Sequence, residues 1–327
     1  MGKIDFVVTY LDSEDKEWQK EKEKYAKINF GDELNSESRY RNMDNFQYWF
    51  RSIEKYAPWV NKIHLITWGH LPDWLNVENP KLNIVNHRDF MPSLSLPTFN
   101  SSALELNFDK IEGLSENFVY FNDDMFLNAS VDEQDFFLDN KPVLNVRLRP
   151  IETDDDFMHL VLSNTIALNK LFKGKKLKIS PLLNINNGIN SLFFNLEFLP
   201  FVIKKKEIIG YQYGHLPYPL KKGTYSILQE YLEKEYQKTC CSKFRELDNI
   251  TLWLLQDYYK ASGYVSPSKI SGKVIDLNSQ GFERVLDSKI KMLCFNDNPK
   301  TKNFGIIKKI LNNALQSKYP TKSSFEL

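Results

Sequence analysis

Residues 117–127 read Asn-Phe-Val-Tyr-Phe-Asn-Asp-Asp-Met-Phe-Leu, a short apolar run that ends abruptly in one amide and two carboxylates. The run from Asn117 to Phe121 is rich in aromatic residues, which is typical of a buried strand. Similar short runs occur at Ile4–Thr9, Lys62–Thr67 and Leu82–Val85. Helix-like segments separate these runs, and strands that alternate with helices predict an α/β sheet.

The helix-like segments of the first half have recognisable ends. A charged stretch, Ser13–Lys27, follows the first strand and is expected to be helical. A second helix is predicted from apolar residues at helical spacing, with Asp44 as its N-cap and Pro58 just beyond its end. The apolar residues concerned are Phe46, Trp49, Phe50 and Ile53.

The second half of the chain is predicted to be more helical, with helices over Tyr225–Tyr236 and Asn249–Tyr259. This change in character suggests a division into three parts. Residues 1–215 are expected to form an α/β core, residues 216–299 a helical part that completes the active site, and residues 300–327 a basic amphipathic tail.

The composition is that of a globular enzyme. Of 327 residues, 42% are hydrophobic and 14% are aromatic, which is enough for a large core and excludes a disordered chain. Lys and Arg total 43 against 42 Asp and Glu, so the net charge of +1 gives no reason to expect nucleic-acid binding.

The cysteines and the apolar segments favour a cytoplasmic protein. The three cysteines, Cys240, Cys241 and Cys294, form no C-x-x-C pair, so neither a disulfide framework nor a structural zinc site is expected. The first residues do not resemble a signal peptide. The most apolar later stretch, Leu192–Ile203, is too short and too polar to cross a bilayer.

Polar residues follow the predicted strands, where open α/β sheets bind their ligands. Asp12 follows the first strand, and Asn122, Asp123 and Asp124 follow the fourth. Two adjacent carboxylates between apolar flanks repel each other and lose hydration, and a divalent cation relieves both penalties. The alternative is a solvated turn.

His215 is a second candidate. It lies in a loop rich in Gly and Pro, Tyr213–Pro219, which can present an imidazole for proton transfer. The alternative is that this histidine is incidental. The chain has no G-x-x-x-x-G-K-[ST], G-x-G-x-x-G or G-x-S-x-G motif, so kinase-type, dinucleotide-type and hydrolase-type sites are not supported.

Four blocks of the sequence, in order, resemble the Stealth family of bacterial polysaccharide hexose-1-phosphate transferases. That family includes the catalytic subunit of the animal lysosomal-enzyme N-acetylglucosamine-1-phosphotransferase. The sequence differs from the family pattern at Asn42 and Gln47, where Asp and Arg are common. The first block is residues 4–12, and the second comprises residues 39–41, 51–60, 96–101 and 120–124. The third comprises residues 214–217 and 244–248, and the fourth is residues 294–297.

The resemblance implies a glycosyltransferase-A-like mixed sheet flanked by helices and a specific reaction. A sugar 1-phosphate would pass from a UDP-sugar to a hydroxyl of a growing capsular or cell-surface polysaccharide, forming a phosphodiester and releasing UMP. The acceptor could be lipid-linked. Three alternatives stay open: a metal-dependent glycosyltransferase that releases UDP, a nucleotide-sugar hydrolase, and an inactive glycan-binding module.

The resemblance also implies roles for individual residues. Asp123 and Asp124 would hold Mg²⁺ or Mn²⁺ on the donor diphosphate. His215 would take the proton of the acceptor hydroxyl, and Arg245 would contact phosphate oxygens. Asp248 would orient one of these two, and Asp12 would contact the nucleotide or the metal. The predicted substrate-binding residues are Arg39, Arg41, Arg51, Asn100, Asn122 and Asn296.

Two of these residues also have simpler explanations. Arg245 could form a surface ion pair with Asp248, because residues three apart meet on a helix. Asn100 could instead be the N-cap of a helix that starts at Ser101.

The tail from Lys300 to Lys322 has six lysines and no acid. Its apolar residues, Phe304, Ile307, Leu311 and Leu315, lie near one face of a predicted helix. One interpretation is that this face rests on anionic lipid at the cytoplasmic face of the membrane. The other, slightly favoured, is that the helix packs on the catalytic core with its lysines in water.

Overall fold

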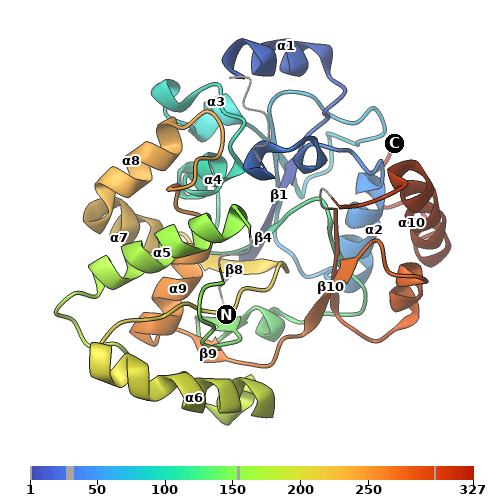
Figure 1. Ribbon diagram of the computed structural model, residues 1–327. Helices are drawn as coiled ribbons and strands as arrows, with labels where there is room; N and C mark the ends of the chain where they lie inside the picture. Colours follow the sequence, from blue (N-terminus) through green and yellow to red (C-terminus); the bar gives the residue numbers. More distant parts are fainter. Residues whose placement is uncertain (1, 27–32, 153–154, 298–299) are drawn as a thin grey trace.

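A five-stranded sheet forms the centre of the molecule. The computed structural model describes residues 2–26, 33–152, 155–297 and 300–327 (Figure 1). The strand order is β3-β2-β1-β4-β8; the first four strands are parallel and β8 is antiparallel to β4. The four predicted strands are confirmed to within one residue at every end. Their bounds are β1 Ile4–Tyr10, β2 Ile63–Thr67, β3 Leu82–Asn86, β4 Asn117–Phe121 and β8 Tyr218–Lys221.

The central strands are buried, and this explains their uninterrupted apolar runs. Every residue of β2 and β4 is buried, as expected when layers of other structure cover a parallel sheet. Two polar side chains inside the sheet satisfy each other across β1 and β2. The His64 Nε2 atom lies 3.2 Å from Asp5 Oδ2, and Asn61 Nδ2 donates to Asp5 Oδ1 at 2.7 Å.

Helices cover the sheet on two sides. Figure 1 shows α2 and α10 on one side of the central strands and α5, α7, α8 and α9 on the other. The fold is therefore the mixed α/β sheet flanked by helices that the sequence predicts. The bounds are α2 Phe46–Tyr56, α5 Phe157–Leu171, α7 Thr224–Tyr231, α8 Glu233–Cys241, α9 Trp253–Ser262 and α10 Phe304–Lys318.

Two predicted helix starts are corrected. Helix α1 spans Lys16–Tyr25 because the carboxylate of Asp15 accepts from the Trp18 amide and so caps the helix; Lys27 lies outside the described residues. Helix α2 ends before Pro58 as predicted, but Asp44 is not its N-cap. Asn45 occupies that position, and Asp44 has a positive φ of 51° and pairs with Lys308.

The helices of the second half also differ from prediction. The helix predicted over 225–236 breaks at the fully buried Leu232 into α7 and α8. Helix α9 starts four residues later than Asn249. The reason is that the Asn249 carboxamide is used elsewhere: it accepts from the Glu246 amide and from Asn100 Nδ2.

The apolar stretch Leu192–Ile203 lies within a long helix, α6 (Ile189–Lys205), which the sequence analysis does not predict. Within the described parts of the chain, no helix combines the length and the apolar character needed to cross a membrane. Two further short helices are α3, His87–Phe90, and α4, Ser101–Glu105.

Two small sheets connect distant segments. In one, β11 pairs in parallel with β10 and antiparallel with β5; in the other, β7 pairs with β6 and β9. Through β8 and β11, residues after 215 therefore pair with β4 and β5. The division at residue 215 stays a prediction. The bounds are β5 Met125–Leu127, β6 Phe137–Leu138, β7 Lys141–Leu144, β9 Ser266–Pro267, β10 Gly272–Asp276 and β11 Met292–Asn296.

The C-terminal tail packs on the core. In α10 the predicted apolar face is turned inward, with Ile307, Leu311 and Leu315 buried. Beyond it, Glu326 pairs with Arg51 of α2 at 2.6 Å. The packed interpretation of the tail is confirmed, and the apolar face proposed to rest on lipid is not available because the core covers it.

Candidate active site

A cleft of about 730 Å³ opens at the carboxyl ends of β1 and β4. These strands are neighbours in the sheet, and the chain order reverses between them: β1 leads outward to β2 and β3, whereas β4 lies on its other side. Such a reversal leaves a crevice between the loops that follow the two strands. Thr9 and Tyr10 line it from β1, and Asn122, Asp123 and Asp124 line it from the turn after β4.

The acidic pair sits in the tight turn between β4 and β5, where the Met125 amide donates to the Asn122 carbonyl at 3.1 Å. The side chain of Asp123 is exposed to the open cleft. Loss of hydration, and then repulsion from Asp124, raise the pKa of Asp123 to about 7. Oδ1 of Asp124 is buried and has no hydrogen-bond partner among the described residues. The charge of His215 lowers the pKa of Asp123 but only partly offsets that rise.

Two side chains from distant segments approach Asp124. The Cys294 thiol donates to Asp124 Oδ2 at 3.2 Å, and His215 Nε2 lies 3.5 Å from the same oxygen. One potential ligand atom from each of the three residues lies within 4.8 Å of the others. Burial, followed by the charge of Asp124, raises the pKa of the Cys294 thiol well above its usual value. The thiol is therefore a neutral donor to the carboxylate.

The pairing of strands brings these residues together. In the β4–β8 pair Tyr218 lies opposite Tyr120, which carries the preceding His215 to the turn after β4. In the β5–β11 pair Cys294 lies opposite Met125, and the Phe295 amide donates to the Asp124 carbonyl at 2.9 Å. The third and fourth sequence blocks thus meet the second at one point.

Hydrogen bonds orient the His215 ring. Asn122 Nδ2 lies 3.3 Å from His215 Nε2, and Tyr218 Oη lies 2.8 Å from Nδ1. An amide nitrogen only donates, so this arrangement assigns Nε2 as the acceptor and Nδ1 as the protonated nitrogen, which donates to Tyr218. The unprotonated nitrogen is the one that lies by Asp124 and the cleft.

Arg245 enters the cleft from the loop before α9. Two hydrogen bonds with Asn35 hold the backbone of Arg245 in place. The Asn35 carboxamide accepts from the Arg245 amide and donates to the Arg245 carbonyl, both at 3.0 Å. Its guanidinium donates through Nη2 to Ser101 Oγ at 2.6 Å. A planar cation held in this way suits recognition of phosphate oxygens.

Glu105 is a site residue that the sequence analysis missed. It lies at the end of α4, lines the cleft and accepts from Tyr120 Oη at 3.4 Å. Burial raises the pKa of Glu105, and the positive charge of Arg245 partly offsets that rise. The only sequence signal was a lone acid in an apolar segment, Ala103 to Leu106, a pattern that surface helices also produce.

The structure brings most of the predicted site residues together. Arg41 pairs with Asp297 at 3.2 Å, which joins the second sequence block to the fourth across the cleft. Arg39 is exposed and lies over the Phe157 ring at 5.5 Å. Eight predicted residues line the cleft: Arg39, Arg41, Asn122, Asp123, Asp124, His215, Arg245 and Asn296.

Two of the remaining predicted residues have structural partners away from the cleft. Arg51 donates to Glu326 and to the Tyr319 carbonyl, so its guanidinium fastens the tail rather than reaching substrate. Asn100 is fully buried and caps α4 by accepting from the Ser102 amide, as the alternative interpretation predicts. Its Nδ2 donates to Asn249, and this fixes the loop that carries Arg245.

Asp248 and Asp12 also lie outside the cleft lining. Asp248 is exposed and pairs with Lys238, so it orients neither Arg245 nor His215, and the alternative ion pair between Arg245 and Asp248 is not formed. Asp12 follows the cleft residue Leu11; its amide donates to His70 Nε2 at 2.8 Å and its carboxylate accepts from the Glu14 amide. These contacts shape the loop after β1.

Sequence comparisons match the chain over its whole length. A family profile described as Stealth protein CR2, conserved region 2, matches residues 39–144. The capsular polysaccharide phosphotransferase WcwK of Streptococcus pneumoniae is 37% identical over all of this chain and 99% of that protein. The chain belongs to the Stealth family of polysaccharide phosphotransferases. The exopolysaccharide phosphotransferase cps2G of Lactiplantibacillus plantarum, 34% identical over 99% of the chain and 96% of that protein, is another relative.

Membership of the Stealth family confirms the resemblance seen in the sequence blocks. The matched region contains Arg39, Arg41, Asp123 and Asp124 and ends before His215 and Arg245. Among solved structures, the galactosyltransferase LgtC in complex with donor and acceptor sugar analogues covers 98% of both chains with a TM-score of 0.42 and 9% identity. A similarity of that size adds nothing to the assignment of this Stealth protein's site.

Proposed function

We propose that this protein transfers a sugar 1-phosphate from a UDP-sugar to a hydroxyl of a growing capsular or cell-surface polysaccharide. The product is a phosphodiester and the leaving group is UMP. The observation that carries the proposal is the convergence of a carboxylate pair, an oriented imidazole and a clamped guanidinium in one cleft. Phosphoryl transfer needs this combination of positioning and charge neutralisation rather than covalent chemistry.

The carboxylate pair fits a divalent cation. Asp123 and Asp124 offer the oxygen ligands that Mg²⁺ and Mn²⁺ prefer, and the free Oδ1 of Asp124 and the raised pKa of Asp123 both indicate uncompensated negative charge. Such an ion, when bound, would neutralise charge on the donor diphosphate and on the leaving phosphate. Asp123 and Asp124 would hold it against the turn after β4.

His215 supplies the proton acceptor. Its Nε2 takes the proton of the acceptor hydroxyl as the oxygen attacks the phosphorus that bears the sugar, and the bond from that phosphorus to the UMP oxygen breaks. Donation from Nδ1 to Tyr218 holds the ring in the tautomer in which Nε2 carries no proton. No atoms or electrons are needed beyond those of the donor and the acceptor.

The positive charge around the cleft would bind the donor. Arg245 would contact the oxygens of the diphosphate, with Ser101 holding the guanidinium in place. Arg39, Arg41 and Asn296 line the same cleft and would contact the remainder of the donor or acceptor. The reaction would take place at the cytoplasmic face of a membrane if the acceptor is lipid-linked.

Phosphorus NMR of the products tests the proposal. Purified protein would be incubated with Mg²⁺, UDP-N-acetylglucosamine or UDP-galactose, and a capsular oligosaccharide that contains phosphodiesters. We expect UMP and a new phosphodiester resonance that depend on acceptor, metal and active protein. Release of UDP with a new glycosidic bond would identify a glycosyltransferase instead. Sugar phosphate formed without acceptor would identify a hydrolase.

A further inference from the structure

Helix α6 is apolar on its outer face as well as on its inner one. The inner face, which includes Asn195, Leu199 and Val202, is buried. On the opposite side, side chains four, seven and fourteen residues after Ile189 fall on one helical stripe. We name these residues the outer stripe: Ile189, Phe193, Leu196 and Ile203, which are 72%, 68%, 49% and 54% exposed.

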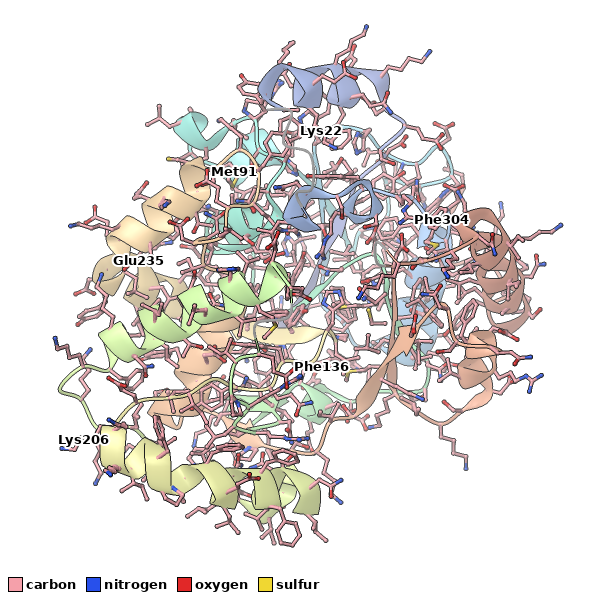
Figure 2. The ribbon with its side chains drawn as sticks, in the orientation of Figure 1. Lys22, Met91, Phe136, Lys206, Glu235 and Phe304 are labelled. Atoms are coloured by element: carbon pink, nitrogen blue, oxygen red, sulfur yellow. The ribbon has the colours of Figure 1, made fainter. Side chains whose placement is uncertain are left out.

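The outer stripe is too large to be incidental. Single exposed apolar residues are normal, but a row of four on one helix is the pattern of a contact surface. Ile185, in the turn just before α6, is 77% exposed and adds to the same end of the helix. Figure 2 shows the side chains of α6 projecting away from the rest of the molecule along its outer edge.

The stripe is presented by a rigid helix. Asn195 on the inner face donates to the carbonyls of Val146 and Leu182 and accepts from the Leu148 amide, at 2.7–2.8 Å. These three bonds are buried and tie α6 to the body of the protein. Substitutions on the outer stripe therefore leave the packing of α6 intact.

Lysines lie at one end of the stripe, and a single exposed acid, Glu207, directly follows them in the chain. From Phe157 to Lys206 the chain has eight lysines and a single acid, Glu197, so this segment carries a net charge of +7 and the rest of the chain −6. Lys204, Lys205 and Lys206 are exposed at the end of α6, and Figure 2 marks Lys206 there. A second exposed group, Lys173, Lys175 and Lys176, follows α5.

Hydrogen bonds bring the two lysine groups to the same end of the molecule. Asn169, near the end of α5, donates to the Ile208 carbonyl and accepts from the Ile208 amide, both at 2.8 Å. The C-terminal ends of α5 and α6, and the lysines that follow α5 and end α6, therefore lie close to this junction. An apolar stripe next to concentrated positive charge is typical of a helix that lies in the interface of an anionic membrane.

We propose that α6 docks this protein on an anionic lipid bilayer, with the outer stripe among the upper acyl chains and the lysines on the headgroups. The charge of the segment favours a lipid bilayer over a second copy of the chain as the partner of α6. A symmetric contact through α6 would set one segment of charge +7 against another, which is unfavourable. The inference does not rest on the reaction, since membrane binding requires neither donor nor acceptor.

Vesicle flotation of the full-length protein tests the proposal. We expect binding to vesicles of phosphatidylcholine mixed with phosphatidylglycerol, weak binding to phosphatidylcholine alone, and release at high salt. Phe193→Ser with Leu196→Ser should lower the partition coefficient at least roughly tenfold, because burial of one large apolar side chain is worth more than that factor. Ile306→Ser, on the exposed side of α10, is the matched control and should bind as the unmodified protein does.

A separate variant tests the role of the lysines. Replacing Lys204, Lys205 and Lys206 by Gln should reduce the preference for anionic vesicles while the stripe remains. Equal flotation of the unmodified and stripe-substituted proteins, or no binding to anionic vesicles, would overturn the proposal. So would self-association in solution that the stripe substitutions abolish, because the stripe would then join two copies. Circular dichroism and thermal melts confirm that each variant is folded.

Discussion

The Nε2 atom of His215 lies 3.5 Å from Oδ2 of Asp124. The nitrogen that we propose as the proton acceptor therefore lies beside the carboxylate that we propose as a metal ligand. Because the two roles meet at one point of the cleft, an acceptor hydroxyl that reaches His215 would also lie close to the donor diphosphate.

Replacement of His215 should slow the chemical step. We expect His215→Ala to lower kcat by about 10²–10⁴-fold with a much smaller change in the KM for the donor, as is typical when a general base is removed. Tyr218→Phe removes only the partner of Nδ1 and should have a smaller effect. Steady-state kinetics with released UMP as the readout measure both variants. Loss of donor binding without loss of kcat in His215→Ala would assign His215 to substrate binding.

The stability of the metal-free protein should depend on Asp123 and pH. The pKa of Asp123 is raised from 3.8 to about 7, so the folded state holds its proton more tightly than the unfolded chain does. As far as Asp123 is concerned, the folded protein is most stable below about pH 4, and its free energy of unfolding falls as pH rises to about 7. In EDTA, Asp123→Asn should therefore match the unmodified protein at low pH and become the more stable of the two at pH 8.

Added Mg²⁺ provides the control for this comparison. At pH 8 the cation should raise the melting temperature of the unmodified protein and leave that of Asp123→Asn nearly unchanged. Differential scanning fluorimetry across pH, with and without Mg²⁺, measures both effects. An equal response of the two proteins to Mg²⁺ would remove the metal-binding role of Asp123.

Arg51 should matter for stability rather than for the reaction. Its guanidinium and the Glu326 carboxylate are almost fully buried, and removal of one partner leaves the other charge unpaired. We expect Arg51→Ala to lower the free energy of unfolding by about 3–5 kcal/mol. Below its melting temperature, KM and kcat should stay close to those of the unmodified protein. Arg149→Ala breaks an exposed pair with Glu152 and should cost less than about 1 kcal/mol.

Asp248→Asn should leave catalysis unchanged, although its sequence position beside Arg245 suggests a catalytic role. Its exposed carboxylate pairs with Lys238, and such surface pairs contribute about 0–1 kcal/mol to stability. Urea unfolding and steady-state kinetics measure the two expectations. A large fall in kcat would show that the loop carrying Arg245 rearranges when substrate binds.

Neighbouring residues alone specify the strands and the acidic turn. The runs at Ile4–Thr9 and Asn117–Phe121 are apolar because both faces of the sheet are covered, and that pattern is local in the chain. Asn122, Asp123 and Asp124 were visible because they interrupt apolar residues at the end of a strand. The sequence blocks also identified the family, which the comparisons with relatives confirm.

Contacts between distant segments select the polar residues that reach the cleft. Cys294 joins Asp124 because β11 pairs with β5, and Glu105 enters the site because α4 ends at the cleft. Arg51 and Asn100 belong to matched blocks yet serve the fold: one is paired with Glu326 and the other is bonded to Asn249. The apolar pattern of a strand depends on residues that are neighbours in the chain, so it can be recognised in the sequence. The partner of a charge or an amide depends on contacts between segments far apart in the chain, so it becomes known only from the fold.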